Sequence, residues 1–248
     1  MTLQGAARDS DLLRYLARRR FSPGERLPAI HELAEELGLS TGKLREQLEV
    51  ARQLGLVDVR PKTGIRASGY SFLPGVWVSL RQALALDPVY FYQFEALRNH
   101  IEEAFFEEAV RLLLPEDLRH LKALVERAWE RLRGDPIQIP HGEHRELHLT
   151  IYSRLDNLFV RGLLESYWEA YESVGLSVYA DYGFLHDVWS FHEKIVDGIL
   201  AGTFEEAHRT LVEHTGLVQY RPRLAQPAGN AANGAGGADP RSRRGVKR

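Results

Sequence analysis

Residues 22–66 contain, in order, the pattern of two short helices joined by a tight turn and then a basic hairpin. Apolar residues recur at helical spacing up to Gly38, and a second helical segment begins after Ser40, a residue type preferred as an N-cap. A Gly-Leu-Val segment, a turn over 61–64 and a basic return strand follow. This order is that of a winged helix-turn-helix, which places one helix in the major groove of DNA and a hairpin beside it. The pattern therefore predicts a DNA-binding domain.

The charges are distributed unevenly along the 248 residues, although the net charge is only −2. Lys and Arg outnumber Asp and Glu by 12 to 9 in residues 1–70 and by 7 to 1 in residues 221–248, but are outnumbered by 24 to 13 in residues 71–220. We therefore expect the ends and the acidic middle to have different partners. The last segment is rich in Gly, Ala and Asn and predicts a disordered basic tail, either an inert extension or a non-specific contact to DNA phosphates.

The composition also limits the compartment and the kinds of site. The chain has no cysteine, which excludes disulfides and thiolate metal ligands and fits a reducing compartment. No apolar run approaches the roughly 20 residues that span a bilayer, and the N-terminus lacks the apolar core of a signal peptide. We expect a cytoplasmic protein with no membrane partner.

Beyond the first domain the spacing of apolar residues is helical and no strand pattern is evident. The expected helices cover residues 87–114, 115–133, 140–155, 157–175, 184–201 and 203–220. The predicted fold is mainly α, with an N-terminal winged helix-turn-helix followed by an antiparallel bundle of six or seven helices. A stretch punctuated by Gly and Pro at 67–75 marks the linker. The expected divisions are a DNA-binding domain at 1–70, a linker at 71–79, an all-helical domain at 80–220 and the tail at 221–248.

These segments together resemble the GntR family of bacterial transcription regulators, in the branch with an FadR-type, all-helical FCD effector domain. The N-terminal resemblance lies in PGERLP, ELAEELGLS, LREQLE and GLV, and covers about residues 10–68. The C-terminal resemblance is looser but keeps order and spacing over about 85–218, through FEALRNHIEE, LHLTIYSRLDN and FHEKIVDGILAGTFEEAHRTLVEH. The resemblance implies a homodimer that binds a palindromic double-stranded DNA operator and responds to a small molecule.

The resemblance also indicates which residues contact DNA. Arg45 matches the family, whereas His31 and Thr41 stand where family members often carry arginine. Arginine to guanine is the usual bidentate base contact, so these two differences imply an operator unlike the family's common one or one recognised more by its shape. The expected DNA-contacting residues are Ser40, Thr41, Lys43 and Arg45 in the recognition helix, His31 before it, and Lys62, Thr63 and Arg66 in the wing.

Four of the ten histidines have a spacing that suggests a metal site. A subset of the family binds a divalent metal with an Asp and a His at i and i+4, and with one His from each of the last two long helices. His148, His192 and His214 match that pattern, and His144 takes the position of the Asp, with His141 as an alternative fourth ligand. Neutral imidazoles suit zinc, nickel or another first-row ion better than magnesium or calcium. We expect a divalent metal, zinc first.

Replacing the Asp by His removes one negative charge from the ligands of the ion. We infer that a carboxylate of the effector supplies this charge. Arg98 matches a family position that faces the pocket and would bind such a carboxylate in bidentate fashion, and Asn157 matches another pocket position. The alternative for Arg98 is an ion pair with Glu95 or Glu102 on its own helix.

Two other functions compete with a metal-dependent regulator. One is a metal-free regulator of the same type with an acyl or other apolar effector. The other is a zinc hydrolase with an accessory DNA-binding domain, since three histidines and an open position can activate a water molecule. The sequence contains no HExxH motif, and Glu193 beside His192 would project in another direction. We therefore expect no enzymatic activity.

Overall fold

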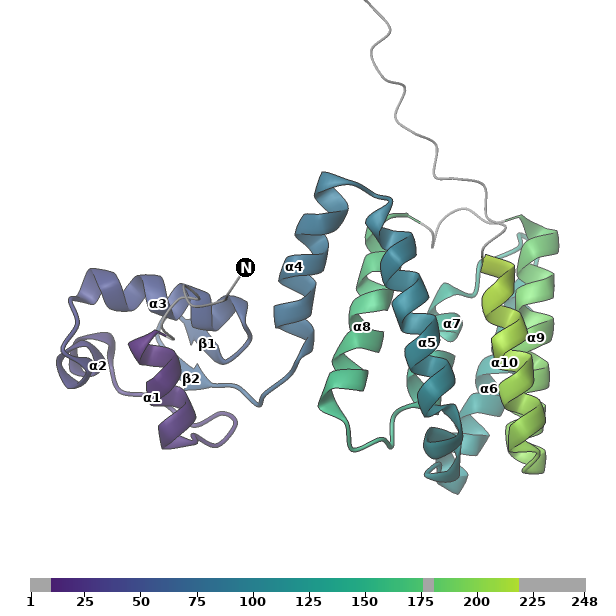
Figure 1. Cartoon of the computed structure of the whole chain (residues 1–248), viewed down its shortest axis with the longest axis horizontal. Helices are drawn as coiled ribbons and strands as arrows, with labels where there is room; N and C mark the ends of the chain where they lie inside the picture. The colour runs from purple at the N-terminus through teal and green to yellow at the C-terminus, as the bar shows by residue number, and fades with distance from the viewer. Residues whose placement is uncertain (1–9, 176–180, 219–248) are drawn as a thin grey trace, which may run out of the picture.

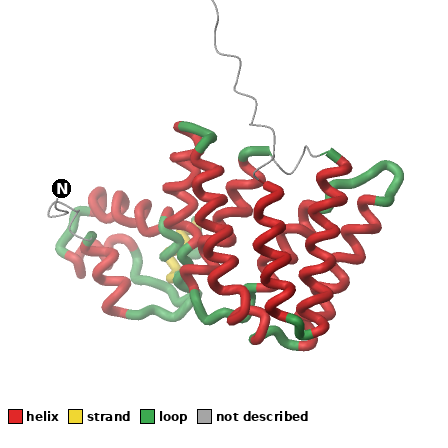
Figure 2. Tube along the Cα trace, turned by 45° about the vertical axis from the view of Figure 1, so that its right-hand side comes forward, coloured by secondary structure: helices red, strands yellow, loops and turns green. Residues whose placement is uncertain are grey.

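The computed structural model describes residues 10–175 and 181–218, which form ten helices and one two-stranded antiparallel hairpin (Figures 1 and 2). The elements, in chain order, are α1 (Asp11–Arg19), α2 (Ile30–Leu37), α3 (Thr41–Gln53), β1 (Val57–Arg60), β2 (Gly64–Ala67), α4 (Leu73–Leu86), α5 (Tyr90–Arg111), α6 (Pro115–Leu132), α7 (His141–Ile151), α8 (Leu158–Ser173), α9 (Tyr182–Ala201) and α10 (Phe204–Val218). The predicted tail at 221–248 lies outside the described residues.

The N-terminal unit has the predicted order of helix, turn, helix and hairpin. Gly38 ends α2 in a left-handed conformation, and the hydroxyl of Ser40 accepts a hydrogen bond from the backbone N–H of Lys43, which caps α3. The hairpin pairs Val57 with Ala67 in antiparallel register. One small core contains side chains from α1, α2, α3 and the hairpin, among them Leu12, Leu33, Leu44, Leu48 and Ile65. The winged helix-turn-helix is therefore as predicted.

The helical domain has its main core among α5, α6, α7, α8, α9 and α10. Leu121 and Leu124 of α6, Leu147 of α7 and Trp189 of α9 are buried in this core, and α9 and α10 pack along each other. With α4, which packs on α8, the described residues of this domain form seven helices, as the predicted bundle of six or seven requires. Among the described residues, no helix combines the length and the apolar character needed to cross a bilayer.

Helix α4 was not predicted. Its first residues, 73–79, fall inside the segment that the sequence predicts to be a linker, because a Gly- and Pro-rich stretch is typical of a loop. Proline is nevertheless tolerated in the first turn of a helix, where its missing N–H would have no partner, and Pro74 occupies this position. Leu80 and Leu84 of α4 are buried in a small core with Phe91 and Trp168, so the packing of its apolar residues outweighs the loop-forming composition.

Two glycines allow the start of α4 to approach both units closely. A Cβ atom on Gly55, at the end of the helix-turn-helix, would lie 2.6 Å from Cγ of Pro74. A Cβ atom on Gly162 of α8 would lie 2.7 Å from Cβ of Phe72 and 2.8 Å from the backbone N of Leu73. The ring of Phe72 also contacts Phe159 edge-on, with centroids 5.0 Å apart. Residues 72–74 therefore form a tightly packed joint between the DNA-binding unit and α8.

Replacing Gly162 by Ala should destabilise the protein, because the added methyl overlaps the Phe72 and Leu73 backbone region. We expect the free energy of unfolding in a urea titration to fall by about 1–3 kcal/mol, the usual cost of overpacking. Gly142→Ala in α7 is the matched control, since no atom lies within 4 Å of its Cβ position. That change should raise stability by about 0.5–1 kcal/mol, as Gly to Ala does inside helices. Equal effects at both glycines would contradict the tight joint.

Candidate functional site

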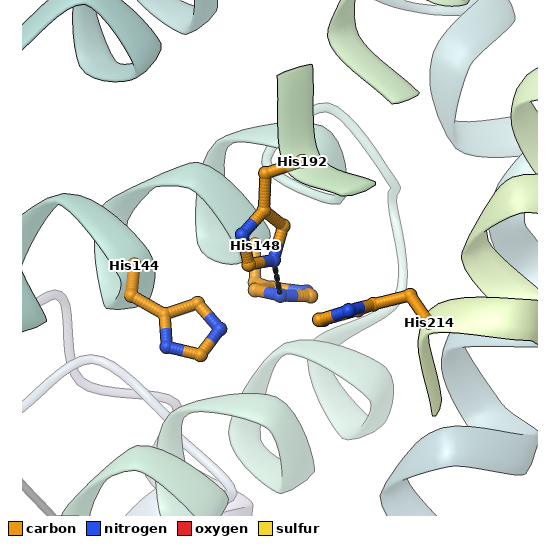
Figure 3. Close-up of side chains that lie close together, drawn as sticks. All are labelled: His144, His148, His192 and His214. Carbon is orange, nitrogen blue, oxygen red and sulfur yellow. Dashed lines mark hydrogen bonds between the residues drawn. The ribbon is translucent and has the colours of Figure 1, made fainter. Parts of the chain in front are cut away.

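Four imidazoles meet inside the helical domain (Figure 3). His144 and His148 lie one turn apart on α7, His192 comes from α9 and His214 from α10. Each ring offers one nitrogen, and these four atoms all lie within 4.8 Å of one another. The side chains of His148, His192 and His214 are buried, and that of His144 is half-buried. These are the four histidines named from the sequence as metal ligands.

The cluster is enclosed by aromatic side chains. His144 contacts Trp168 of α8 edge-on at 4.8 Å between ring centroids, and Trp189 of α9 lies 5.0 Å from His192. Trp168 and Trp189 are almost completely buried. The imidazoles therefore lie in a medium of low dielectric constant, where a charged ring would be poorly solvated. The spacing of residues in the sequence did not indicate that Trp168 and Trp189 would enclose the histidines.

His141, the alternative fourth ligand, is not part of the cluster. Its ring stacks on Tyr171 with centroids 5.4 Å apart, and its Nε2 lies 3.1 Å from a carboxylate oxygen of Glu172. The i to i+4 spacing of His144 and His148 aligns both rings on one face of α7, whereas His141 is turned toward α8. The structure thus groups His144, and not His141, with the other three histidines.

A buried ion pair lies directly behind His148. Arg98 and Glu102 are one turn apart on α5, are 4% and 0% exposed, and have Nη2 and Oε1 3.0 Å apart. The Oε2 atom of Glu102 lies 3.1 Å from Nδ1 of His148, and Nη2 of Arg98 lies 2.9 Å from the same nitrogen. The guanidinium also lies over the ring of Tyr167, 4.6 Å from its centroid. Arg98 therefore makes the ion pair that sequence reasoning offered as its alternative role, and it does so beside the histidines.

Burial determines the protonation of two histidines of the cluster, His148 and His192. It lowers the pKa of His148, against the opposing charge of Glu102, and it lowers the pKa of His192 well below its ordinary value, with further contributions from the neighbouring histidines. Burial alone would raise the pKa of Glu102, but Arg98 and His148 hold this pKa below its ordinary value. His148 and His192 are therefore neutral at neutral pH, with a lone pair available on one ring nitrogen.

The donor set fits a first-row transition metal. Nε2 of His148 and Nε2 of His192 are 3.0 Å apart, close to the about 3.3 Å between imidazole ligands of a tetrahedral ion with bonds of about 2.05 Å. Nδ1 of His192 is buried and has no hydrogen-bond partner among the described residues. An unpaired buried polar atom costs free energy of folding, which indicates that this ring is kept for a role other than stabilising the fold. Four nitrogen donors suit zinc, nickel or copper(II) and do not suit magnesium or calcium.

Asn157 has a structural role at the start of α8. Its Oδ1 accepts hydrogen bonds from the backbone N–H groups of Phe159 and Val160, both 3.1 Å long. This is the usual geometry of an N-cap, and it occupies the carboxamide oxygen. The sequence named Asn157 only for its match to a family pocket position, and its value as an N-cap was not recognised.

The residues expected to contact DNA lie at the surface of the N-terminal unit. Thr41, Lys43 and Arg45 are exposed in the first turns of α3, with Ser40 before them. Lys43 forms an exposed ion pair with Glu46 at 3.1 Å, so its contribution to a phosphate contact competes with this carboxylate.

The remaining expected DNA contacts lie in α2 and the wing. His31 is exposed in the first turn of α2, and Lys62 and Thr63 are exposed at the tip of the hairpin. Lys62 has a φ of 70°, an uncommon conformation for a residue other than glycine. Arg66 donates to the backbone carbonyl of Gly24 at 2.7 Å, which ties the return strand to the preceding loop.

Family models match both units of the chain. The model of bacterial regulatory proteins of the gntR family matches residues 10–66, and the FCD domain model matches residues 93–217. No curated protein matches the sequence.

Among solved structures, a Streptococcus agalactiae GntR protein is similar with a TM-score of 0.60 and 21% identity, over 84% of this chain and 95% of that one. E. coli McbR/YncC matches with a TM-score of 0.45 and 23% identity, over 85% of this chain and 95% of that one. At these identities the first likeness supports the fold alone.

Acidification should destabilise the metal-free protein. Because burial lowers the pKa of His148 and His192, the unfolded state takes up protons below about pH 6.5 that the folded state does not. The free energy of unfolding should therefore fall from pH 7.5 to 5.5, by at most about 1.4 kcal/mol per pH unit for each histidine.

Urea titrations of chelator-treated protein at several pH values measure this slope. His192→Gln should reduce it, whereas His100→Gln should leave it unchanged, since the side chain of His100 is 81% exposed. Identical slopes for the wild type and His192→Gln would show that burial of His192 does not oppose its protonation.

Proposed function

Because the chain belongs to the GntR family of bacterial regulatory proteins and carries an FCD domain, it is a DNA-binding transcription regulator, and we propose that its helical domain senses a small carboxylate through a bound divalent metal ion. The observation that carries this proposal is the convergence of four imidazole nitrogens within 4.8 Å. We propose zinc as the ion, with nickel or another first-row ion as the alternative, because affinity alone does not separate these metals at a nitrogen site. Both matched families consist of regulators, and the chain is not an enzyme.

His144, His148, His192 and His214 would hold the ion through one nitrogen each. All four ligands are neutral when bound, so they leave the charge of the ion uncompensated. Arg98 and Glu102 neutralise each other in their ion pair and do not change this balance. A bound metal ion would act as a Lewis acid to which carboxylate oxygens bind. An ion that accepts five or six ligands would keep one or two coordination positions for these oxygens beside the four imidazoles.

The charge of the site favours an anionic effector. An uncompensated divalent charge among Trp168, Trp189 and the buried histidines is costly in a medium of low dielectric constant, and an entering carboxylate offsets part of this cost. Arg98 lies beside His148 and is the proposed second contact for the carboxylate. Asn157 stays outside this proposal, because its oxygen caps α8.

We propose that the regulator is a homodimer on a palindromic operator, because a two-fold protein axis places two recognition helices on two half-sites. Exposed apolar side chains at the end of α4, in the turn after it and on α5 are the proposed surface for self-association. Leu86 is 74% exposed, and Val89, Tyr90 and Leu97 are 47%, 40% and 47% exposed. Exposed apolar groups of this size in sequence proximity are typical of an interface.

The division into domains follows the same proposal. We assign DNA binding to residues 1–70 and effector binding to residues 80–220, with residues 71–79 between them. Helix α8 contacts the histidine cluster through Trp168 and the joint through Gly162. A shift of α8 on effector binding would therefore move Phe72 and Pro74, and with them the DNA-binding unit, which is the two-site coupling that allostery requires.

Metal retention provides the direct test of the sensor. Wild-type protein that is stripped by a chelator, reloaded with zinc and passed through gel filtration should retain about one ion per chain, since that chain supplies all four imidazole ligands of the proposed site. His192→Ala should lose the ion, and His100→Ala on the exposed face of α5 should keep it. Metal is measured by plasma mass spectrometry. Absence of metal from the wild type would favour a metal-free regulator.

A second prediction concerns the recognition helix. Arg45→Ala should lower affinity for the operator by about 1–3 kcal/mol and relax preference at one base position, because arginine reads guanine in bidentate fashion. Arg52→Ala is the matched control, since Arg52 is exposed in the last turn of the same helix and is paired with Glu49 at 2.6 Å.

Fluorescence anisotropy at constant salt, with an operator selected from a random DNA library by the wild type, measures both effects. Uniform weakening on all sequences by Arg45→Ala would assign this side chain to a phosphate contact instead.

A further inference from the structure

The Nδ1 atom of His148 has two neighbours that demand opposite hydrogen-bond roles. Glu102 Oε2, 3.1 Å away, can only accept a hydrogen bond, so it requires a proton on Nδ1. Arg98 Nη2, 2.9 Å away, can only donate, so it requires a lone pair on Nδ1. A neutral imidazole has one proton, and Nδ1 can satisfy only one of these neighbours at a time.

The choice at Nδ1 determines what the other ring nitrogen offers. When Nδ1 accepts from Arg98, the proton of the neutral ring is on Nε2, which then donates to Nε2 of His192 across 3.0 Å. When Nδ1 donates to Glu102, Nε2 of His148 carries a lone pair that faces the other imidazoles. Only the second tautomer makes Nε2 a possible metal ligand.

We propose that Glu102 is a positioning residue that holds His148 in the tautomer with the proton on Nδ1, and that Arg98 stabilises the competing tautomer. This inference rests on the metal site proposed above and adds two residues that determine its affinity. None of the four proposed ligands is a carboxylate. Glu102 supplies a negative charge one hydrogen bond behind one of them, His148.

The position of Glu102 is well determined by its surroundings. Its side chain is fully buried, and one carboxylate oxygen contacts Arg98 at 3.0 Å while the other faces His148. The hydroxyl of Tyr152 donates to the backbone carbonyl of Glu102 at 2.8 Å, which fixes this turn of α5 against the end of α7. A carboxylate held in this way can orient the ring of His148 without reorganisation when an ion binds.

Zinc affinity of the full-length protein tests the role of Glu102. In a competition titration with a chromophoric chelator, Glu102→Gln should bind zinc about 10–100-fold more weakly than the wild type, the usual effect of losing such an orienting carboxylate. Glu143→Gln is the matched control, because Glu143 is a buried carboxylate on α7 that pairs with Arg131 at 2.8 Å and not with a histidine of the cluster. Equal affinities of Glu102→Gln and the wild type would overturn the inference.

Nitrogen-15 NMR of the histidine rings reads the tautomer and needs no variant. In zinc-free wild type, His148 should carry its proton on Nδ1. A zinc-free protein with the proton of His148 on Nε2 would contradict the role of Glu102 even if Glu102→Gln failed to fold. A wild type that binds no zinc would instead refute the proposed metal site, so the two failures are distinguishable.

Discussion

The helical domain depends on the convergence of four imidazoles at one point, three of which are buried. Rings from α7, α9 and α10 bring nitrogen atoms within 4.8 Å, between two buried tryptophans. Burial keeps His148 and His192 neutral, which is the form that a cation needs and the form that a dry interior tolerates. Neutral histidines therefore suit both the stability of the metal-free fold and the proposed sensor. Because the rings come from α7, α9 and α10, the packing of these three helices determines the geometry of one site.

The ion pair behind the cluster extends this arrangement to α5. Arg98 and Glu102 offset the cost of burying each other, and both contact the same nitrogen of His148. Helix α8 continues the network on the other side, since it carries Trp168 at the cluster and Gly162 at the joint with Phe72. A continuous set of packed elements thus runs from the histidines to the DNA-binding unit.

Sequence reasoning was most successful where the signal is local. Ser40 caps α3 as its residue type predicts, and the spacing of His144 and His148 aligned both rings on one helical face. It was least successful at residues 73–79, where Gly and Pro suggested a loop and the structure has the start of α4. Loop composition is a weak preference, and the close packing of Phe72 and Leu73 on Gly162 outweighs it.

The sequence by itself determined the order of the elements, the winged helix-turn-helix and the set of candidate histidines, because caps, turns and helical periodicity act between residues that are near in the chain. Only the tertiary structure decided that His144 rather than His141 joins the cluster, that Arg98 and Glu102 lie against His148, and that α4 is a packed joint. These outcomes depend on contacts between residues far apart in sequence, such as His148 with Glu102, and on the exclusion of water around them. Neither is encoded in any short stretch of the chain.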